Sequence, residues 1–126
     1  MITAEKMPLY FHPLYTDGIH PDARFPRDRY RLIAQRFEAP GRSDLVSVQT
    51  APKASSTEVE MAHDADYVAR FLGGEMTIDE RRRIGLRPWT DLLIPRTLHI
   101  MGGAIAGLKS VMASGGVAAN MARGSF

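Results

Sequence analysis

Apolar residues recur at helical spacing in two parts of the chain. In residues 26–37 the spacing predicts a helix with one apolar stripe, made of Tyr30, Ile33, Ala34 and Phe37. In residues 91–114 a longer seam has the same character and consists of Ile94, Leu98, Met101, Ile105, Leu108 and Met112. We expect this seam to pack against the core rather than to form a coiled coil. Gly103, Ala106 and Gly107 leave a second, smooth face that a sheet or another helix can approach closely.

Short apolar runs bounded by turn residues indicate three strands. These are residues 9–11, 45–48 and 117–121. A loop is predicted from Thr16 to Pro26, where glycine and proline interrupt the pattern. Three shorter helices are predicted between the second and the third strand. Ser55 and Glu58 have the spacing of a capping box at the first of them. The other two cover residues 63–72 and 77–83.

The order of these elements is typical of an α/β layer with parallel strands. We therefore predict a single domain over residues 1–126, built on a partial open parallel sheet with flanking helices. A parallel sheet is normally covered by helices on both faces, and one long amphipathic helix cannot cover both. We expect an exposed sheet edge, through which the chain self-associates or binds a missing C-terminal part.

The composition narrows the classes of protein to consider. Hydrophobic residues make up 44% and charged residues 24% of the 126 positions, as in a globular protein. The formal net charge is only +2, so we predict no nucleic-acid partner. The absence of cysteine excludes disulfides and thiolate metal sites and fits a reducing, cytoplasmic location. The apolar stretch 98–119 carries Lys109 near its middle, which favours a buried helix and a strand over a membrane span.

Four segments carry a resemblance to a known family. They are YFHPLY from Tyr10, HP…RFP…RYRL from His20, AHDADYV from Ala62 and RRIG…PWT…RT…GG from Arg82. In these segments and their order the chain resembles bacterial deacetylases related to class IV of the histone deacetylase superfamily. The resemblance implies an arginase/deacetylase-like fold, of which this chain would form the N-terminal part. It also implies zinc-dependent hydrolysis of N-acetyl groups from lysine side chains or small amines.

The resemblance stops where the family carries its paired histidines. Here residues 117–121 are followed by Ala122 to Phe126, with Arg123 at a glycine position and Phe126 in place of the first histidine. The histidines of the chain are His12, His20, His63 and His99, so no two are adjacent. We therefore expect a chain that is truncated before the metal site, inactive by itself and without the zinc of the complete family. A non-enzymatic interaction module and one half of a split deacetylase remain as alternatives.

No residue of this chain is predicted to be catalytic or to bind a metal. By resemblance, the loops 20–29 and 84–89 would border the active-site mouth of a complete enzyme. They supply three candidates for the substrate rim or channel, namely His20, Arg29 and Trp89. Arg29 matches a basic position that lies near the inner channel in relatives. Trp89 either lines the substrate entrance or packs its loop onto the core.

The remaining polar candidates have structural interpretations. His12, like His20, precedes a proline, and we expect both to fix turns through hydrogen bonds. Asp64 and Asp66 fit acidic residues at the N-terminus of a helix better than a pair of acid–base carboxylates. His99 lies on the long helix and fits a hydrogen-bonded core histidine.

Overall fold

The elements follow one another in the predicted order, with one addition. The structure is a computed structural model that describes residues 6–42 and 44–123. The elements are β1 (Met7–Phe11), α1 (Leu14–Asp17), α2 (Asp28–Glu38), β2 (Val46–Thr50), α3 (Ser56–Glu60), α4 (Ala65–Leu72), α5 (Ile78–Ile84), α6 (Leu93–Ser114) and β3 (Ala119–Asn120). The addition is α1, which includes the start of the predicted loop. His12 Nδ1 accepts a hydrogen bond from the Leu14 N–H at 3.0 Å, which satisfies a free donor at the start of this short helix.

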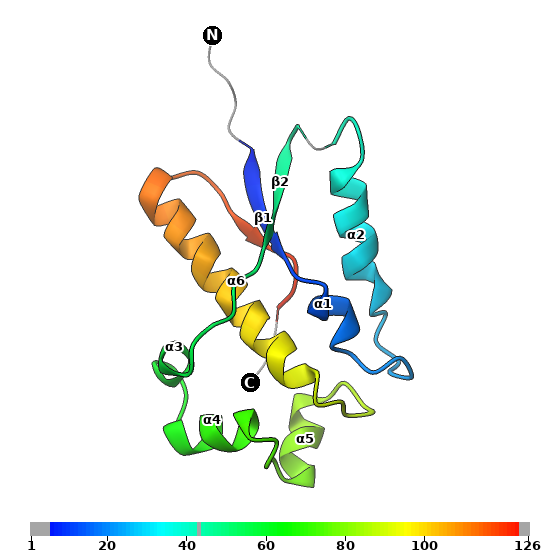
Figure 1. Ribbon diagram of the computed structural model, residues 1–126, viewed down its shortest axis with the longest axis vertical. Helices are drawn as coiled ribbons and strands as arrows, with labels where there is room; N and C mark the ends of the chain where they lie inside the picture. Colours follow the sequence, from blue (N-terminus) through cyan, green and yellow to red (C-terminus); the bar gives the residue numbers. More distant parts are fainter. Residues whose placement is uncertain (1–5, 43, 124–126) are drawn as a thin grey trace.

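The three strands form one parallel sheet in the order β2-β1-β3 (Figure 1). All five residues of β1 pair with β2. β3 is only two residues long, shorter than the predicted segment 117–121, and pairs with Leu9 and Tyr10. The prediction of an α/β protein with a small parallel sheet and flanking helices is therefore confirmed. Within the described residues, β2 and β3 are the two edges of the sheet.

Helix α6 packs closely against its neighbours through glycines. It runs diagonally across β1 and β3 in Figure 1, while α2 lies beside β2. A Cβ atom at Gly102 would lie 1.8 Å from the carbonyl oxygen of Pro52, and one at Gly103 would lie 2.8 Å from the hydroxyl of Tyr15. Neither distance is possible for a side chain, so only glycine allows these contacts. Gly103 and Gly107 of the predicted smooth face are both buried, whereas Gly102 packs on the segment before α3.

The apolar seam of α6 is buried along only part of its length, which corrects the expectation that the whole seam packs against the core. Leu98 is buried at 5% exposure, but Leu108 and Met112 are 60% and 78% exposed. Only the first half of the seam is covered, because it packs with residues of α3 and α4 in a small core around Val59 and Val68. The main buried face of α6 is rotated from the seam and comprises Leu93, Arg96, Thr97, Ile100, Gly103 and Gly107.

The larger core lies where α1, α2 and α6 meet the sheet. Its buried members are Tyr15, Ile19, Tyr30, Ala51, Ile100 and Ala122. The ring of Tyr15 is the centre of this cluster, because it meets both Phe11 and Tyr30 edge-on at centroid distances of 5.8 Å and 6.1 Å. This core holds the end of β1 against the first turns of α6.

The helix caps are local features that the sequence predicts well. Ser55 and Glu58 form the expected capping box, and Thr77 and Glu80 form a second one at α5. Asp64 caps α4 by accepting a hydrogen bond from the Tyr67 N–H, as expected for an acid at a helix N-terminus. None of the helices in the described ranges is long and apolar enough to cross a membrane.

Candidate functional site

The carboxyl ends of the three strands meet at one edge of the sheet, where α/β proteins commonly bind ligands. Tyr15 follows β1 at this edge and is fully buried. Its hydroxyl donates a hydrogen bond of 2.6 Å to Asn120 Oδ1 at the end of β3. Asn120 Nδ2 donates in turn to the Ile100 carbonyl of α6 at 2.8 Å. This chain of hydrogen bonds connects α1, β3 and α6, and burial raises the pKa of Tyr15 above its usual value.

Arg96 is a buried cation at the same edge. Its residue is only 4% exposed, and its Nε–H donates to the Tyr15 carbonyl at 3.0 Å. The guanidinium carbon lies 5.6 Å from the centroid of the Tyr30 ring. Among the described residues Arg96 has no ion pair with a carboxylate, and burial lowers its pKa below the usual range for arginine.

A cavity of about 190 Å³ opens beside Arg96, and we call it the inner cavity. It is lined by Phe25, Tyr30, Ile84, Leu86, Leu93, Arg96, Thr97 and Arg123. Two of these residues are cations and most of the others are apolar. A positively charged wall in a small apolar space suits a small anion that carries an apolar group.

Arg29, one of the three predicted site residues, lies next to this cavity without lining it. It is exposed, and its guanidinium lies 4.6 Å from the Phe25 ring centroid and 5.1 Å from that of Tyr30. Its Nη2 donates to the Tyr30 hydroxyl at 3.3 Å. Because Phe25 and Tyr30 both line the inner cavity, Arg29 adds positive charge behind its aromatic wall.

His20 and Trp89 lie further from the inner cavity and have structural contacts of their own. His20 Nδ1 accepts the Asp22 N–H at 3.0 Å, the turn-fixing role predicted for it. Trp89 meets Phe71 edge-on at a centroid distance of 6.5 Å, and its indole N–H donates to Asp91 at 3.2 Å. Trp89 therefore packs its loop onto α4, which is the second of the two roles predicted for it.

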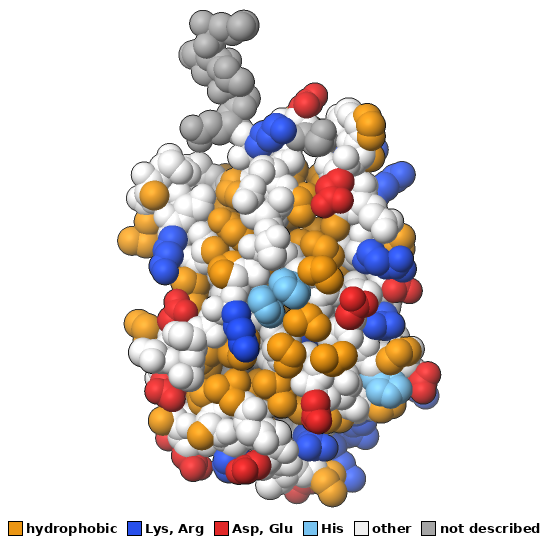
Figure 2. All heavy atoms as spheres, viewed as in Figure 1, with side chains coloured by type: hydrophobic (Ala, Val, Ile, Leu, Met, Phe, Trp, Pro, Cys, Tyr) orange, Lys and Arg blue, Asp and Glu red, His pale blue; other side chains and the backbone are white. Residues whose placement is uncertain are grey.

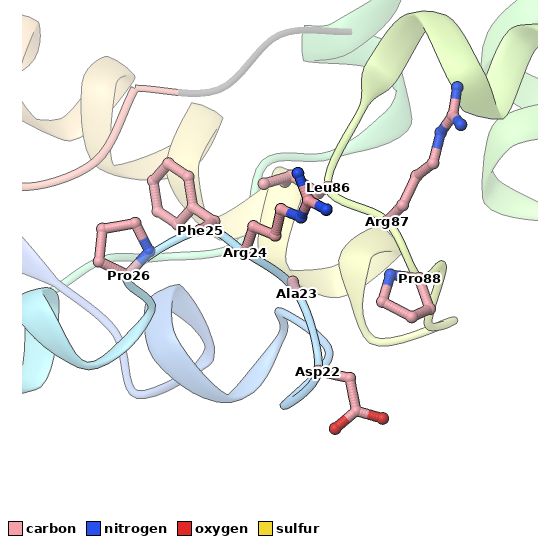
Figure 3. Close-up of a pocket in the computed structure, with 8 residues that line it drawn as sticks. All are labelled: Asp22, Ala23, Arg24, Phe25, Pro26, Leu86, Arg87 and Pro88. Carbon is pink, nitrogen blue, oxygen red and sulfur yellow. The ribbon is translucent and has the colours of Figure 1, made fainter.

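The two loops predicted to form the rim do face each other. Between them lies a pocket of about 750 Å³, lined by residues 22–26 and 86–88 (Figure 3). Figure 3 shows Arg24 beside Leu86, whereas the Arg87 side chain points away from residues 22–26. His20, Arg29 and Trp89 flank this pocket in sequence but are not part of its walls.

Arg96 and Arg123 line the inner cavity but were not among the site residues predicted from the sequence. The signal for Arg96 was present, since it lies three residues after Leu93 and four before Ile100, on the buried face of α6. A cation on an apolar helix face is unusual unless it has a partner or a function. Arg123 follows β3 directly, at the edge where the carboxyl ends of the strands meet.

The described residues do not fit a metal centre. In the ranges 6–42 and 44–123, no group of three or more histidine, aspartate or glutamate side chains is arranged to hold an ion. His12 and His99 stack with ring centroids 3.8 Å apart, but backbone groups occupy both Nδ1 atoms. The first accepts from Leu14, and the second lies 2.9 Å from the Ala51 carbonyl.

The sequence is similar to that of an uncharacterized protein. No family model matches the chain. The chain is 31% identical over 118 residues to an uncharacterized protein of Picosynechococcus sp.. The match covers 94% of this chain and 39% of that protein, so the chain spans about two fifths of the length of this curated relative.

Proposed function

We propose that this chain forms the N-terminal part of a deacetylase-like domain of the histone deacetylase superfamily. In this proposal it builds the inner cavity that receives the carboxylate released from an N-acetyl-lysine or a small acetylated amine. Hydrolysis itself depends on residues outside this chain, supplied by a further part of the same protein or by a second chain. The four resembling segments and the parallel sheet support the family and the arginase/deacetylase-like fold.

The observation that carries the proposal is the unbalanced charge of Arg96 at the wall of a small cavity. Removing a guanidinium from water is costly unless a partner compensates for it, and the Tyr15 carbonyl and the Tyr30 ring compensate only in part. A carboxylate would complete the pairing through charge-assisted hydrogen bonds. The methyl group of acetate would lie against the apolar walls formed by Phe25 and Leu93.

The role that we propose for this chain does not involve binding the zinc of the family. The described residues do not fit a zinc site, and the sequence has no adjacent histidines. The chain's own contribution is to hold an anion at Arg96 and to keep that site apart from bulk water.

Acetate binding by the isotopically labelled chain tests this proposal. We expect acetate to shift the NMR signals of the Arg96 side chain and of Thr97 in a saturable way, and uncharged acetamide to have little effect. Arg96→Met should lower the affinity by about tenfold or more, the effect of losing a charge-assisted contact of about 1.4 kcal/mol.

Two further variants keep the test decisive. Arg123 is exposed, so Arg123→Gln should weaken acetate binding without unfolding the chain. Arg36 is an exposed arginine of α2 that does not line the cavity, and Arg36→Met is the matched control. Equal acetate binding by wild type, Arg96→Met and Arg123→Gln would refute the proposal, as would equal binding of acetamide.

A second candidate function, a non-enzymatic interaction module, is favoured by the uncovered end of α6. Leu108 and Met112 are exposed there, and Figure 2 shows hydrophobic side chains at the surface over this end of the helix. Sedimentation at increasing protein concentration separates the two candidates. Self-association that Met112→Lys abolishes would favour the module, whereas a monomer at all concentrations would count against self-association.

A further inference from the structure

A second pocket lies on the outer side of the loop that follows α5, and we call it the outer pocket. It has a volume of about 270 Å³ and is lined by Ile78, Arg81, Arg82, Arg87, Pro88 and Trp89, among others. It is distinct from the inner cavity, because Leu86 lines that cavity while the next residue, Arg87, lines the outer pocket. The inner cavity and the outer pocket share no lining residue, although Arg87 and Pro88 also line the pocket in Figure 3.

The apolar part of the outer pocket is held in place. The Trp89 ring is fixed by its edge-on contact with Phe71, which is only 1% exposed, and by its hydrogen bond to Asp91. Pro88, the residue before Trp89, also lines the outer pocket, and Ile78 is 70% exposed at the start of α5. An indole that is already ordered binds an apolar group at little further cost in conformational entropy.

The charged part of the outer pocket has more cations than anions. The Arg81 guanidinium carbon lies 4.9 Å from the Trp89 ring centroid, and its Nε is buried and has no hydrogen-bond partner among the described residues. Arg87 is exposed and has no ion pair in the described part of the chain, whereas Arg82 is paired with Asp79 at 3.6 Å. At least two guanidinium groups therefore stand beside apolar surface without a carboxylate.

We propose that the outer pocket binds a carboxylate attached to an aromatic or branched apolar group. The apolar group would lie against Ile78, Pro88 and Trp89, and the carboxylate would pair with Arg81 and Arg87. A free aromatic acid and the C-terminal residue of a peptide both have this chemistry. The inference does not depend on the proposed deacetylase role, since it uses neither Arg96 nor the inner cavity.

Trp89 is the only tryptophan of the chain, so its fluorescence reports on the outer pocket directly. The probes are phenylacetate as a free acid, N-acetyl-alanyl-phenylalanine as a peptide carboxylate, and the amide of each as its uncharged counterpart. We expect a saturable change in fluorescence with at least one acid and affinities at least tenfold weaker for both amides. A preference for phenylacetate would identify a small-molecule site, and a preference for the dipeptide would identify a site for a peptide C-terminus.

Substitutions on α5 and its loop complete the test. Arg81→Met and Arg87→Met should each weaken binding of the preferred acid several-fold. Because Arg87 is exposed, its variant retains the fold even if Arg81→Met does not. Arg83→Met is the matched control, since Arg83 is an exposed arginine of α5 outside the pocket. Amides that bind as well as the acids, a loss with Arg83→Met equal to that with Arg87→Met, or no saturable signal with either acid would overturn the proposal.

Discussion

Two arginines, Arg70 on α4 and Arg96 on α6, occupy opposite environments. Arg70 is paired with Asp66 on its own helix and with Glu80 on α5, and its side chain is one-third exposed. The hydrogen bond to Glu80 is the main reason that its pKa is raised. Arg96 is almost fully buried, is hydrogen-bonded to a backbone carbonyl, and has a pKa that burial lowers.

The difference separates a structural cation from one that is free to bind a ligand. The charge of Arg70 is balanced within the chain, and its contacts tie α4 to α5 across the intervening loop. The charge of Arg96 is not balanced by any described carboxylate, and it borders the inner cavity. A buried cation in this state is destabilising by itself and gains most from an anion. The regions around Arg70 and Arg96 should therefore respond differently to mutation, to ligands and to pH.

The largest expected effect is the loss of stability in Arg96→Ala. The substitution removes a side chain that packs against Gly18, where a Cβ atom would lie 2.6 Å from that of Arg96, and it leaves the Tyr15 carbonyl without its donor. Truncation of a large buried side chain, partly offset by relief of the buried charge, should lower the free energy of unfolding by about 2 kcal/mol. Urea denaturation measures this change.

Two companion variants sharpen this result. Arg96→Met keeps most of the packed stem and should be more stable than Arg96→Ala, while its affinity for acetate is lowered as described above. Arg70→Met should lower stability less than Arg96→Ala, because the pair with Asp66 is exposed and loss of the partly buried pair with Glu80 leaves the packing of the larger core intact. If Arg70→Met proved the more damaging of the two, the distinction between the structural and the ligand-binding arginine would fail.

A smaller effect is expected from Tyr15→Phe, which probes the hydrogen bonds beneath Arg96. The change keeps the ring contacts with Phe11 and Tyr30 but removes the donor to Asn120 Oδ1. Leaving a partly buried acceptor without its donor should cost about 1–2 kcal/mol in the free energy of unfolding. Hydrogen exchange should show faster opening of β3 than of β2, since the bond connects α1 with β3. Equal acceleration in both strands would contradict this role for Tyr15.

Local chemistry explains what could be predicted from the sequence. Capping boxes such as Ser55–Glu58 depend on residues three positions apart, and helix positions depend on spacing along one element. The parallel direction of the strands followed from the order of strands and helices along the chain. The turn-fixing role of His20 likewise needs only its neighbours in the chain.

Contacts between distant segments explain the features that could not be predicted from the sequence. The apolar seam of α6 did not reveal its main buried face, because that face contains Gly103 and Gly107, which meet Tyr15 and Tyr10. Arg96 counts as polar in a search for apolar periodicity, and its partner, the Tyr15 carbonyl, lies 81 residues away in the sequence. The contact of Trp89 with Phe71 also joins separate segments, and so its packing role stayed open at the level of sequence.

The last expected effect is a difference in pH dependence between the two regions. His12, at the end of β1, has a pKa lowered from 6.5 by burial and by its neighbour His99. The unfolded chain then binds a proton more readily than the folded chain, so stability falls as the pH drops through about 6.5 and levels off below the folded pKa. In the other region, Arg70 and the Thr77 N–H lower the pKa of Glu80 from 4.5 to about 2. This carboxylate therefore stabilises the fold above about pH 4.5, and its contribution is lost as the pH falls towards 2.

Urea midpoints measured from pH 8 to pH 2 should resolve two pH windows, an upper one in which His12 titrates and an acidic one in which Glu80 titrates. His12→Asn preserves an acceptor for the Leu14 N–H but cannot titrate, so it should remove the loss that begins near pH 6.5 and leave the acidic one. Glu80→Gln should do the reverse. Each window involves the uptake of at most about one proton, which makes the slope of stability against pH its quantitative check. If His12→Asn left the upper window unchanged, the histidine pair would not be its source. In that case another group that titrates near neutrality would be the source.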